Sequence, residues 1–449
     1  MRADLVQKYD LRVPRYTSYP TAPHFSDAVT PDMYARWLKA LDPSVPLSLY
    51  HHIPFCDEMC WFCGCYTKIV KRYEPVSEYL DHLLMEIDLV ADTLPGKFQA
   101  RHLHWGGGSP TMLQGNDWRR IIEKLRQRFD FCDDVEIAVE LDPRTASEDY
   151  VRQMAEAGVN RTSIGVQDFD PQVQEAIHRI QPYEMTRQVV EWMAKYGITS
   201  FNMDLMYGLP FQTTEKVLDM VDRGAAMQPR RIALFGYAHV PWMKSHQKMI
   251  PEEALPGTEE RWEQFTKATD RLMELGYVKV GLDHFAHPDD SMATSLEDGS
   301  LQRNFQGYTT DKAPAMIGMG ASAIGQLPQG YVQNLLPLKD YRTAVAAGRF
   351  ATGKGLALSD EDNLRADLIE RLMCDMKVDI DGVCDRHNVP RDHFAQEMEK
   401  LVPLAEDGIC TIDGATVAVT EDGAPFLRLV AAAFDQYLDA GQKRHSKAV

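Results

Sequence analysis

Four cysteines lie close together in the sequence, at Cys56, Cys60, Cys63 and Cys65. The first three follow the pattern C-x3-C-x2-C. Three thiolates can bind three irons of a 4Fe–4S cluster and leave the fourth iron open to another ligand. A structural zinc site is the alternative, but zinc usually takes two Cys or His pairs that lie about a dozen or more residues apart. No second pair lies nearby, so we expect a cluster held by Cys56, Cys60 and Cys63, with Cys65 not a ligand.

Other residues suited to binding lie further along the chain. The triplet Gly106-Gly107-Gly108 would let a ligand approach main-chain N–H groups closely, although a plain turn has the same composition. Glu140 could accept hydrogen bonds from a ribose hydroxyl or an ammonium group. Arg179 could bind a carboxylate through two hydrogen bonds, or be a solvated helix charge. Tyr50 could lie against a cation, but a tyrosine in a strand is more often part of the core.

The elements that must position these residues alternate between strand and helix from about residue 46 to 285. The expected strands are 46–53, 102–105, 136–141, 161–164, 200–206, 231–237 and 277–280. The expected helices between them are 77–94, 116–129, 147–158, 183–196 and 214–228. Such alternation favours a parallel sheet with crossover helices, in which functional residues gather at the carboxyl ends of the strands. An open sheet that binds a nucleotide where the strand order reverses is the alternative.

The chain is expected to be an α/β protein with three regions. They are an N-terminal arm at 1–45, a partial (β/α) barrel at 46–330 and a mostly helical C-terminal domain at 331–449. In the last region we expect helices at 359–376, 380–387 and 391–405, followed by a β-ribbon at 408–419. This order is winged-helix-like. Because the net charge of the chain is −18, we interpret the region as a substrate lid or packing module and not as a DNA reader.

Length, composition and charge exclude several classes of protein. A chain of 449 residues is too long for one compact core, and 44% hydrophobic with 25% charged residues is typical of a globular enzyme. The acidic charge argues against a nucleic-acid partner. No apolar run approaches the ~20 residues that span a bilayer, and the N-terminus has no signal-peptide pattern. We therefore expect a cytoplasmic enzyme without a membrane partner.

The cysteine loop resembles that of radical S-adenosylmethionine (SAM) enzymes. The longer string SLYHHIPFCDEMCWFCGCYTKIVKR is similar to the oxygen-independent coproporphyrinogen III dehydrogenase family. The resemblance continues in order through RYTSYPTA, LHWGGGSPT, ELDPR, SIGVQDF, NMDLMYGLP, LDHFA, RNFQGYTT and IGMGASAIG. Cys65 together with RNFQGYTT points to this family specifically. The resemblance implies a partial barrel of the radical SAM type.

The resemblance also implies a reaction. Two propionate side chains of coproporphyrinogen III would be oxidatively decarboxylated to vinyl groups, giving protoporphyrinogen IX in anaerobic haem synthesis. A SAM-derived 5′-deoxyadenosyl radical would take a hydrogen atom from the substrate, so no protein acid or base is expected to be catalytic. A low-potential donor such as a flavodoxin or ferredoxin would reduce the cluster of a monomeric enzyme. A haem-binding chaperone of the same scaffold, and a radical SAM enzyme acting on another tetrapyrrole, are the alternatives.

In the resembled family two SAM molecules are bound. The residues that match contacts of the cluster-bound SAM are Tyr50, Gly107, Glu140 and Ile324. The residues that match contacts of the second SAM are Phe62, Gly108, Ser109, Gln167, Arg179, Asp204 and Ala238. Ser109 stands where the family commonly has threonine, and His51 is a substitution in the cysteine-loop string.

The substrate carboxylates require basic groups, and we take Arg15, Arg303 and His52 as the candidates. Arg15 lies in the aromatic and basic stretch 14–22 of the N-terminal arm. One interpretation is that this arm closes the barrel mouth, with Tyr16 or Tyr19 sealing the opening. The other interpretation is that its tyrosines only cover apolar surface.

Overall fold

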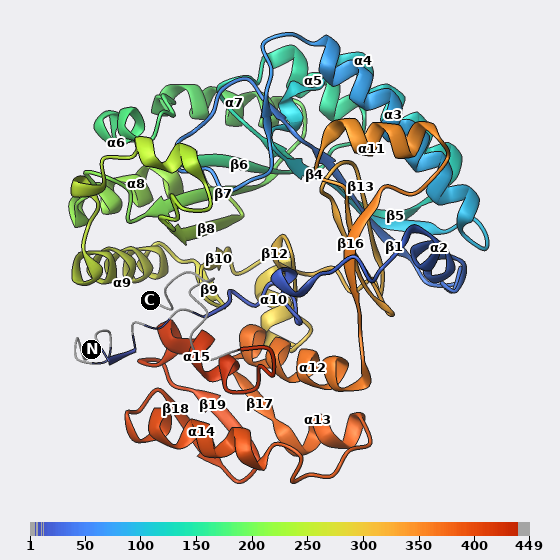
Figure 1. Cartoon of the computed structure of the whole chain (residues 1–449). Coiled ribbons are helices and arrows are strands. Elements are labelled where there is room, and N and C mark those ends of the chain that lie inside the picture. The colour runs from blue at the N-terminus through green and yellow to red at the C-terminus, as the bar shows by residue number, and fades with distance from the viewer. Residues whose placement is uncertain (1–4, 6–7, 10, 12, 439–449) are drawn as a thin grey trace.

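The large sheet of the molecule carries the predicted strands. The computed structural model describes residue 5, residues 8–9, residue 11 and residues 13–438 (Figure 1). Its main sheet has 12 strands in the order β16-β15-β14-β13-β1-β4-β5-β6-β7-β8-β10-β9. The parallel part consists of β13 (Met316–Met319), β1 (Leu47–Ile53), β4 (Gln99–Gly107), β5 (Asp130–Leu141), β6 (Arg161–Gln167), β7 (Ser200–Tyr207) and β8 (Arg231–Gly236).

The order of these strands decides between the two predicted sheet types. From β1 to β8 the spatial order follows the chain, so the strand order does not reverse as it does in an open nucleotide-binding sheet. Within the described residues the outermost strands β16 and β9 do not pair, so the sheet is a partial barrel. β1 is buried at all but one position, as expected of a parallel strand covered on both faces. The expected parallel sheet is therefore confirmed.

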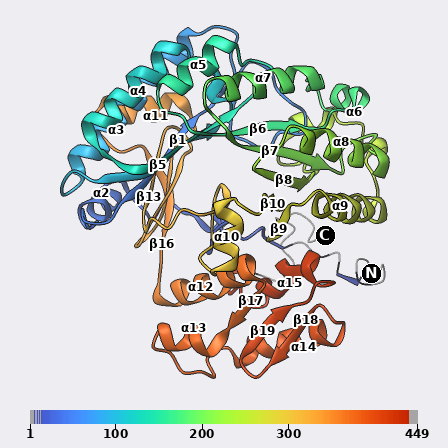
Figure 2. The ribbon, with the colours of Figure 1, turned by 180° about the vertical axis from the view of Figure 1, so that it is seen from behind.

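Amphipathic helices cover the outer face of the parallel strands (Figures 1 and 2). They are α3 (Glu74–Thr93), α4 (Gly115–Arg128), α5 (Glu148–Glu156), α6 (Pro171–Ala176), α7 (Tyr183–Lys195), α8 (Thr214–Ala226) and α9 (Thr258–Glu274). Polar side chains that accept hydrogen bonds cap the first turns of three of these helices. Ser147 caps α5, Asp170 caps α6 and Thr213 caps α8, each accepting from a main-chain N–H one turn later. The expected helices at 77–94, 116–129, 147–158, 183–196 and 214–228 are confirmed.

Antiparallel strands extend the sheet at both edges. One edge carries β9 (Val278–Val280) and β10 (His284–Ala286), and the other carries β14 (Ile324–Leu327), β15 (Gly330–Asn334) and β16 (Thr352–Ala357). The strand expected at 277–280 exists, but it was wrong to include it in the parallel set. The boundary expected at residue 330 falls inside this sheet. Short strands rich in glycine carry little periodicity, which explains why β13–β16 were not predicted.

The C-terminal region lies beside the open side of the sheet (Figure 1). Its elements are α12 (Asp360–Asp375), β17 (Lys377–Asp379), α13 (Ile380–Arg386), α14 (Ala395–Glu406), β18 (Cys410–Asp413), β19 (Thr416–Val419), η5 (Ala424–Phe426) and α15 (Leu427–Ala432). The three expected helices and the β-ribbon are confirmed, and β17 adds a third strand to the ribbon. Smaller elements complete the fold: η1 (Ala22–His24), α10 (Ser291–Glu297), β11 (Gln302–Asn304), β12 (Gly307–Thr309) and α11 (Leu338–Ala346).

The N-terminal arm belongs to two cores. Its helix α2 (Pro31–Lys39) packs in the barrel core through Tyr34, Trp37 and Leu38. The segment before it, including Tyr16 and Tyr19, packs in a separate core with the C-terminal region. The interpretation that one of these tyrosines seals the barrel mouth is therefore wrong. Both are buried, because their rings cover apolar surface of the C-terminal region. No helix in the described part of the chain is long and apolar enough to cross a membrane.

Candidate active site

The cysteine loop, residues 56–65, follows β1 at the carboxyl end of the barrel. Two short parallel strands, β2 (Phe55–Cys56) and β3 (Lys68–Ile69), enclose it. Thr67 Oγ1 donates a hydrogen bond to Cys56 Sγ at 3.2 Å, and the main-chain N–H of Cys65 donates to Cys63 Sγ at 3.4 Å. Hydrogen bonds from the side chain and main chain of Cys65 lower the pKa of the Cys63 thiol.

Two arginines surround the remaining cysteine of the motif. Arg144 Nη2 and Arg179 Nη1 donate to Cys60 Sγ at 3.3 and 3.5 Å. Both guanidinium groups also form ion pairs with Asp142, at 2.7 and 3.2 Å. Burial would raise the pKa of Asp142, but the two arginines hold it at about 2. Arg144 was missed as a functional residue in the sequence, although it ends the ELDPR string.

The donor set fits a 4Fe–4S cluster. Each of the three sulfur atoms accepts a hydrogen bond, and such bonds stabilise sulfur in its thiolate form. In the described part of the chain no three Cys, His, Asp or Glu side chains converge as they would around one metal ion. A cluster binds its cysteines through three different irons, so its ligands need not converge on one point. All eight cysteines are free, so no disulfide competes for these thiols.

Four residues predicted to contact the cluster-bound SAM lie on β1, β4, β5 and β14 of the main sheet. Glu140 at the end of β5 accepts a hydrogen bond from the Gly107 N–H of β4 at 3.1 Å. Gly107 has φ +117°, a conformation that suits glycine, and an added Cβ would meet the His52 ring. Tyr50 on β1 pairs in register with Gly318 of β13. Gly318 in turn lies against the main chain of Ile324, so Tyr50 and Ile324 are linked through β13, and Glu140 and Gly107 are in direct contact.

The side chains around Tyr50 form a connected polar group. The Tyr50 hydroxyl and His52 Nδ1 are 3.0 Å apart, and the Tyr50 ring stacks on the His104 ring at 5.8 Å. His52 Nε2 lies 3.1 Å from the carbonyl oxygen of Tyr66 in the cysteine loop region. Burial lowers the pKa of His52. This histidine therefore supports the strand ends from within the protein.

Three of the residues predicted to contact a second SAM meet at Gly165 of β6. A Cβ at Gly165 would lie 3.2 Å from Gln167 Nε2 and 3.3 Å from Arg179 Nη2. Gly165 also pairs in register with Asp204 of β7. Asp204 accepts hydrogen bonds from Ser163 and Asn202, and burial raises its pKa to about 6.

The other four residues of this set lie beside the cysteine loop. Gly108 and Ser109 donate their main-chain N–H groups to carbonyl oxygens at the end of β1 and the start of β2, at 2.9 and 2.7 Å. The Ser109 side chain is buried and bonds to the hydroxyl of Thr111. Phe62 and Ala238 are joined by the side chain of Gln247, whose Nε2 donates to both carbonyl oxygens at 3.1 and 3.3 Å.

The segment after β8, residues 237–250, closes over the cysteine loop. It contains η3 (Ser245–Met249). His246 Nε2 lies 2.7 Å from the carbonyl oxygen of Cys63, and Lys244 donates to that of Cys65 at 3.4 Å. No motif marked these residues in the sequence, because their partners are main-chain atoms of a distant loop.

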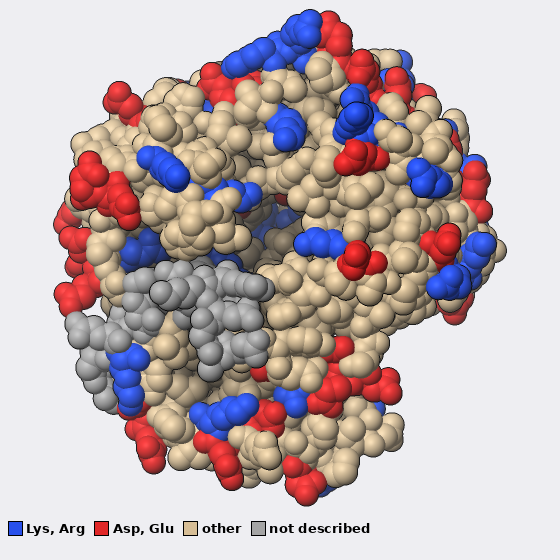
Figure 3. Space-filling model, in the orientation of Figure 1, with Lys and Arg blue, Asp and Glu red and all other residues tan. Residues whose placement is uncertain are grey.

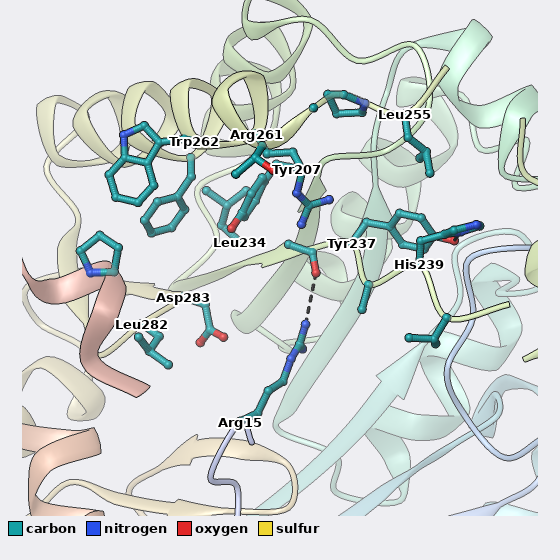
Figure 4. Close-up of a pocket in the computed structure, with 18 of the residues that line it drawn as sticks. Arg15, Tyr207, Leu234, Tyr237, His239, Leu255, Arg261, Trp262, Leu282 and Asp283 are labelled. Carbon is teal, nitrogen blue, oxygen red and sulfur yellow. Dashed lines mark hydrogen bonds between the residues drawn. The ribbon is translucent and has the colours of Figure 1, made fainter. Parts of the chain in front are cut away.

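The same segment borders a cavity of about 470 Å³ (Figures 3 and 4). Figure 3 shows a hollow near the centre of this face, with Lys and Arg side chains in and around it. Of the three basic candidates for binding substrate, Arg15 and Arg303 line the cavity and His52 does not. Two further arginines, Arg261 and Arg428, also line it and were missed in the sequence.

Comparisons with known proteins agree with this architecture. The sequence model of the radical SAM superfamily matches residues 50–224, which contain the cysteine loop and the strands up to β7. An oxygen-independent coproporphyrinogen III oxidase of Bradyrhizobium diazoefficiens is 49% identical over all of both chains. A second, of Cereibacter sphaeroides, is 42% identical over 98% of this chain and 97% of its own. This chain belongs to the oxygen-independent coproporphyrinogen III oxidase family.

A solved structure extends the similarity to three dimensions. The coproporphyrinogen III oxidase (HemN) of Escherichia coli, a radical SAM enzyme, superposes with a TM-score of 0.90 at 37% identity. The match covers 95% of this chain and 100% of that chain. The family resemblance seen in the motifs and the predicted radical SAM fold class are thereby confirmed. Because the chain belongs to the radical SAM superfamily, it uses a 4Fe–4S cluster and SAM.

Proposed function

We propose that this chain is an oxidoreductase that oxidatively decarboxylates two propionate side chains of coproporphyrinogen III in haem biosynthesis, giving protoporphyrinogen IX. The observation that carries the proposal is the full-length similarity to oxygen-independent coproporphyrinogen III oxidases. Each –CH2–CH2–COO⁻ group loses one hydrogen atom, CO2 and one electron, which passes to a one-electron acceptor outside the chain, and a vinyl group remains. When bound, the cluster and SAM supply a 5′-deoxyadenosyl radical, which takes that hydrogen atom.

In this proposal the barrel mouth positions the cofactors. Cys56, Cys60 and Cys63 hold the cluster through their thiolates. Glu140 and the Gly107 main chain, 3.1 Å apart, form the polar wall for the cluster-bound SAM. Tyr50 on β1 lies on the neighbouring strand, and Ile324 on β14 lies further along the same side of the sheet. These residues bind and orient the cluster and SAM, and no side chain needs to transfer a proton.

We assign a second SAM to the group around Gly165. Arg179 and Asp204 present opposite charges there, which suits the carboxylate and ammonium groups of a methionine moiety. Gln167, Gly108 and Ser109 provide further polar atoms, and Phe62 and Ala238 complete the site. Equilibrium dialysis with labelled SAM tests this assignment. Two molecules per chain are expected in the reconstituted enzyme and one in Arg179→Gln, and a wild-type count of one would refute it.

The proposal also includes a monomeric, cytoplasmic enzyme that is reduced by a flavodoxin or ferredoxin. The segment after β8, residues 237–250, covers the cysteine loop through contacts of the Lys244 and His246 side chains with main-chain carbonyl oxygens, so it shields the cluster from solvent on that side. Exclusion of water protects a radical reaction from side reactions.

The deciding experiment measures products under anaerobic conditions. The reconstituted enzyme is mixed with coproporphyrinogen III, SAM and a low-potential reductant, and CO2, 5′-deoxyadenosine and the porphyrin product are quantified. We expect all three from the wild type and none from Cys60→Ser. Stoichiometric haem binding without any CO2 would identify the chain as a haem-binding chaperone instead.

A further inference from the structure

The 470 Å³ cavity brings together four arginines from distant parts of the chain. Arg15 comes from the N-terminal arm, Arg261 from α9, Arg303 from β11 and Arg428 from α15. Figure 4 shows Arg15 and Arg261 reaching into the cavity from opposite sides, between the barrel and the C-terminal region. The cavity therefore exists only where the arm, the barrel and the C-terminal region meet.

Positive charge exceeds negative charge in this cavity. Among the described residues, the lining has two carboxylates, Asp283 and the exposed Glu252, against four guanidinium groups. Asp283 is already occupied, because His284 Nδ1 lies 2.7 Å from its Oδ1. Burial and the nearby Arg15 lower the pKa of Arg428 to about 10. Such a concentration of like charge is costly until an anion neutralises it.

Three of the arginines are held in place without a carboxylate. Arg15, Arg261 and Arg303 donate to main-chain carbonyl oxygens, at 3.2, 3.5 and 3.0 Å respectively. Among the residues that the structure describes, none of the three forms an ion pair. Arg303 Nη1 is buried and has no hydrogen-bond partner in the same part of the chain. These contacts fix the guanidinium groups and leave N–H donors for a ligand.

The rest of the lining suits a flat apolar ligand with acidic arms. Tyr207, Tyr237, Trp262 and Phe265 contribute aromatic surface, and Leu234 contributes an aliphatic side chain. Pockets with apolar walls and a few fixed polar groups are typical of small-molecule sites. The cavity also borders the segment that covers the cysteine loop, so a ligand here would extend toward the barrel mouth.

We propose that this arginine cavity anchors the propionate carboxylates that the reaction leaves intact. The inference rests on the proposed function and adds a carboxylate subsite to it. Coproporphyrinogen III carries four propionates, and its product keeps two. The arginines therefore bind an unreacted edge of the macrocycle while another edge faces the barrel mouth.

The chemistry of the reaction explains why these arginines face the unreacted groups. A carboxylate that leaves as CO2 loses its negative charge along the reaction path. Paired guanidinium groups stabilise the charged ground state more than the transition state, and would slow that step. When arginines pair with a propionate that does not react, the pairing contributes binding energy and does not oppose catalysis.

The first test measures binding to the reconstituted enzyme by fluorescence. The probes are coproporphyrin III, which is the stable oxidised tetracarboxylate, and its tetramethyl ester. We expect Arg261→Gln and Arg303→Gln to weaken acid binding roughly tenfold each and to leave ester binding unchanged, because the ester lacks the charge that arginine pairs. Arg261→Lys should restore part of the affinity. The control is Arg342→Gln, which removes a surface arginine paired with Glu78 outside the cavity.

The second test separates anchoring from catalysis through steady-state kinetics. Loss of an anchor should raise KM for coproporphyrinogen III about tenfold with kcat of the first decarboxylation nearly unchanged. The monovinyl product should accumulate, because a loosely held intermediate dissociates before its second turnover. An unchanged KM and acid affinity in both variants, or a fall in kcat at constant KM, would overturn the proposal. Wild-type enzyme that releases no CO2 would instead refute the proposed function, whatever the binding data show.

Discussion

The cysteine loop and the arginine cavity are neighbours, yet they differ in how their charged side chains are paired. Around the loop nearly every ionic group has a partner within the protein: Asp142 bridges Arg144 and Arg179, and Glu140 binds the Gly107 main chain. In the cavity, arginines bind carbonyl oxygens and outnumber the acids. The loop is organised by its own residues, whereas among the described residues the cavity has more positive than negative side chains.

The largest expected effect concerns the loop. Cys56→Ser, Cys60→Ser and Cys63→Ser should each prevent cluster assembly, because a serine hydroxyl is not deprotonated at neutral pH as a thiolate ligand is. Cys65→Ser should retain its cluster, since its main-chain N–H still reaches Cys63 Sγ. Iron and sulfide content after anaerobic reconstitution measures this. Loss of iron from Cys65→Ser would show that the loop uses a fourth ligand.

A matched pair of arginine variants tests the comparison directly. Arg144→Gln should destabilise the protein by about 2 kcal/mol, because it removes charge-assisted bonds to a buried carboxylate. Arg261→Gln should change stability by less than about 0.5 kcal/mol or stabilise the ligand-free protein, because it relieves repulsion. Urea unfolding of both variants measures the difference. Equal destabilisation would mean that the cavity arginines are as firmly paired as those at the loop.

A smaller effect should appear where the arm is fixed beside the cavity. The Tyr16 hydroxyl donates to the buried carboxylate of Asp435 at 2.9 Å. Tyr16→Phe removes this bond and should cost about 1.5 kcal/mol. The loss should appear in the C-terminal core, while cluster content stays at the wild-type level, because the loop contacts neither residue. Hydrogen exchange resolved by segment checks this, and reduced cluster content would contradict it.

The last prediction concerns a pH dependence at the barrel mouth. Burial raises the pKa of Asp204 from 3.8 to about 6, so the folded protein binds this proton more tightly than the unfolded chain. Stability should therefore fall as pH rises from about 4 to 6, and stay lower above 6. Asp204→Asn should weaken this dependence in the cofactor-free protein, while the buried Asp168, whose pKa is also raised to about 6, retains its own part. A wild-type stability that rises over the same interval would contradict the assignment.

The fold was largely predictable, because its signals are local. Each parallel strand and crossover helix has its own apolar period, and caps such as Ser147 and Thr213 mark the helix starts. The antiparallel strands from β14 to β16 were not predictable, because they are short and hold together through pairing with one another. The packing partners of the arm's tyrosines were not predictable for a similar reason. A tyrosine has the same sequence signature whether it covers a cavity mouth or joins a distant core.

The site residues also fall into those that the sequence could predict and those that it could not. The cysteines and the glycine triplet could be found because their members are adjacent in the chain. Arg144 lay within a recognised string and was overlooked. The sequence carries no signal for Gln247, Arg261 or Arg428, because each joins the site only when folding brings distant segments together. The roles of the individual SAM-contact residues stay predictions that binding measurements must test.

The shared core of the arm and the C-terminal region has a consequence for the order of biosynthesis. Tyr9, Val13 and Tyr16 leave the ribosome before the barrel, but the residues of the core they share, including Phe426 and Phe434, are synthesised after it. The barrel strands lie between them in the chain and can pair during translation. The arm must therefore wait until the C-terminal region has been synthesised before its packing partners exist. A ribosome stalled before residue 426 would carry a folded barrel with an undocked arm, and protease sensitivity of that arm would report the moment of closure.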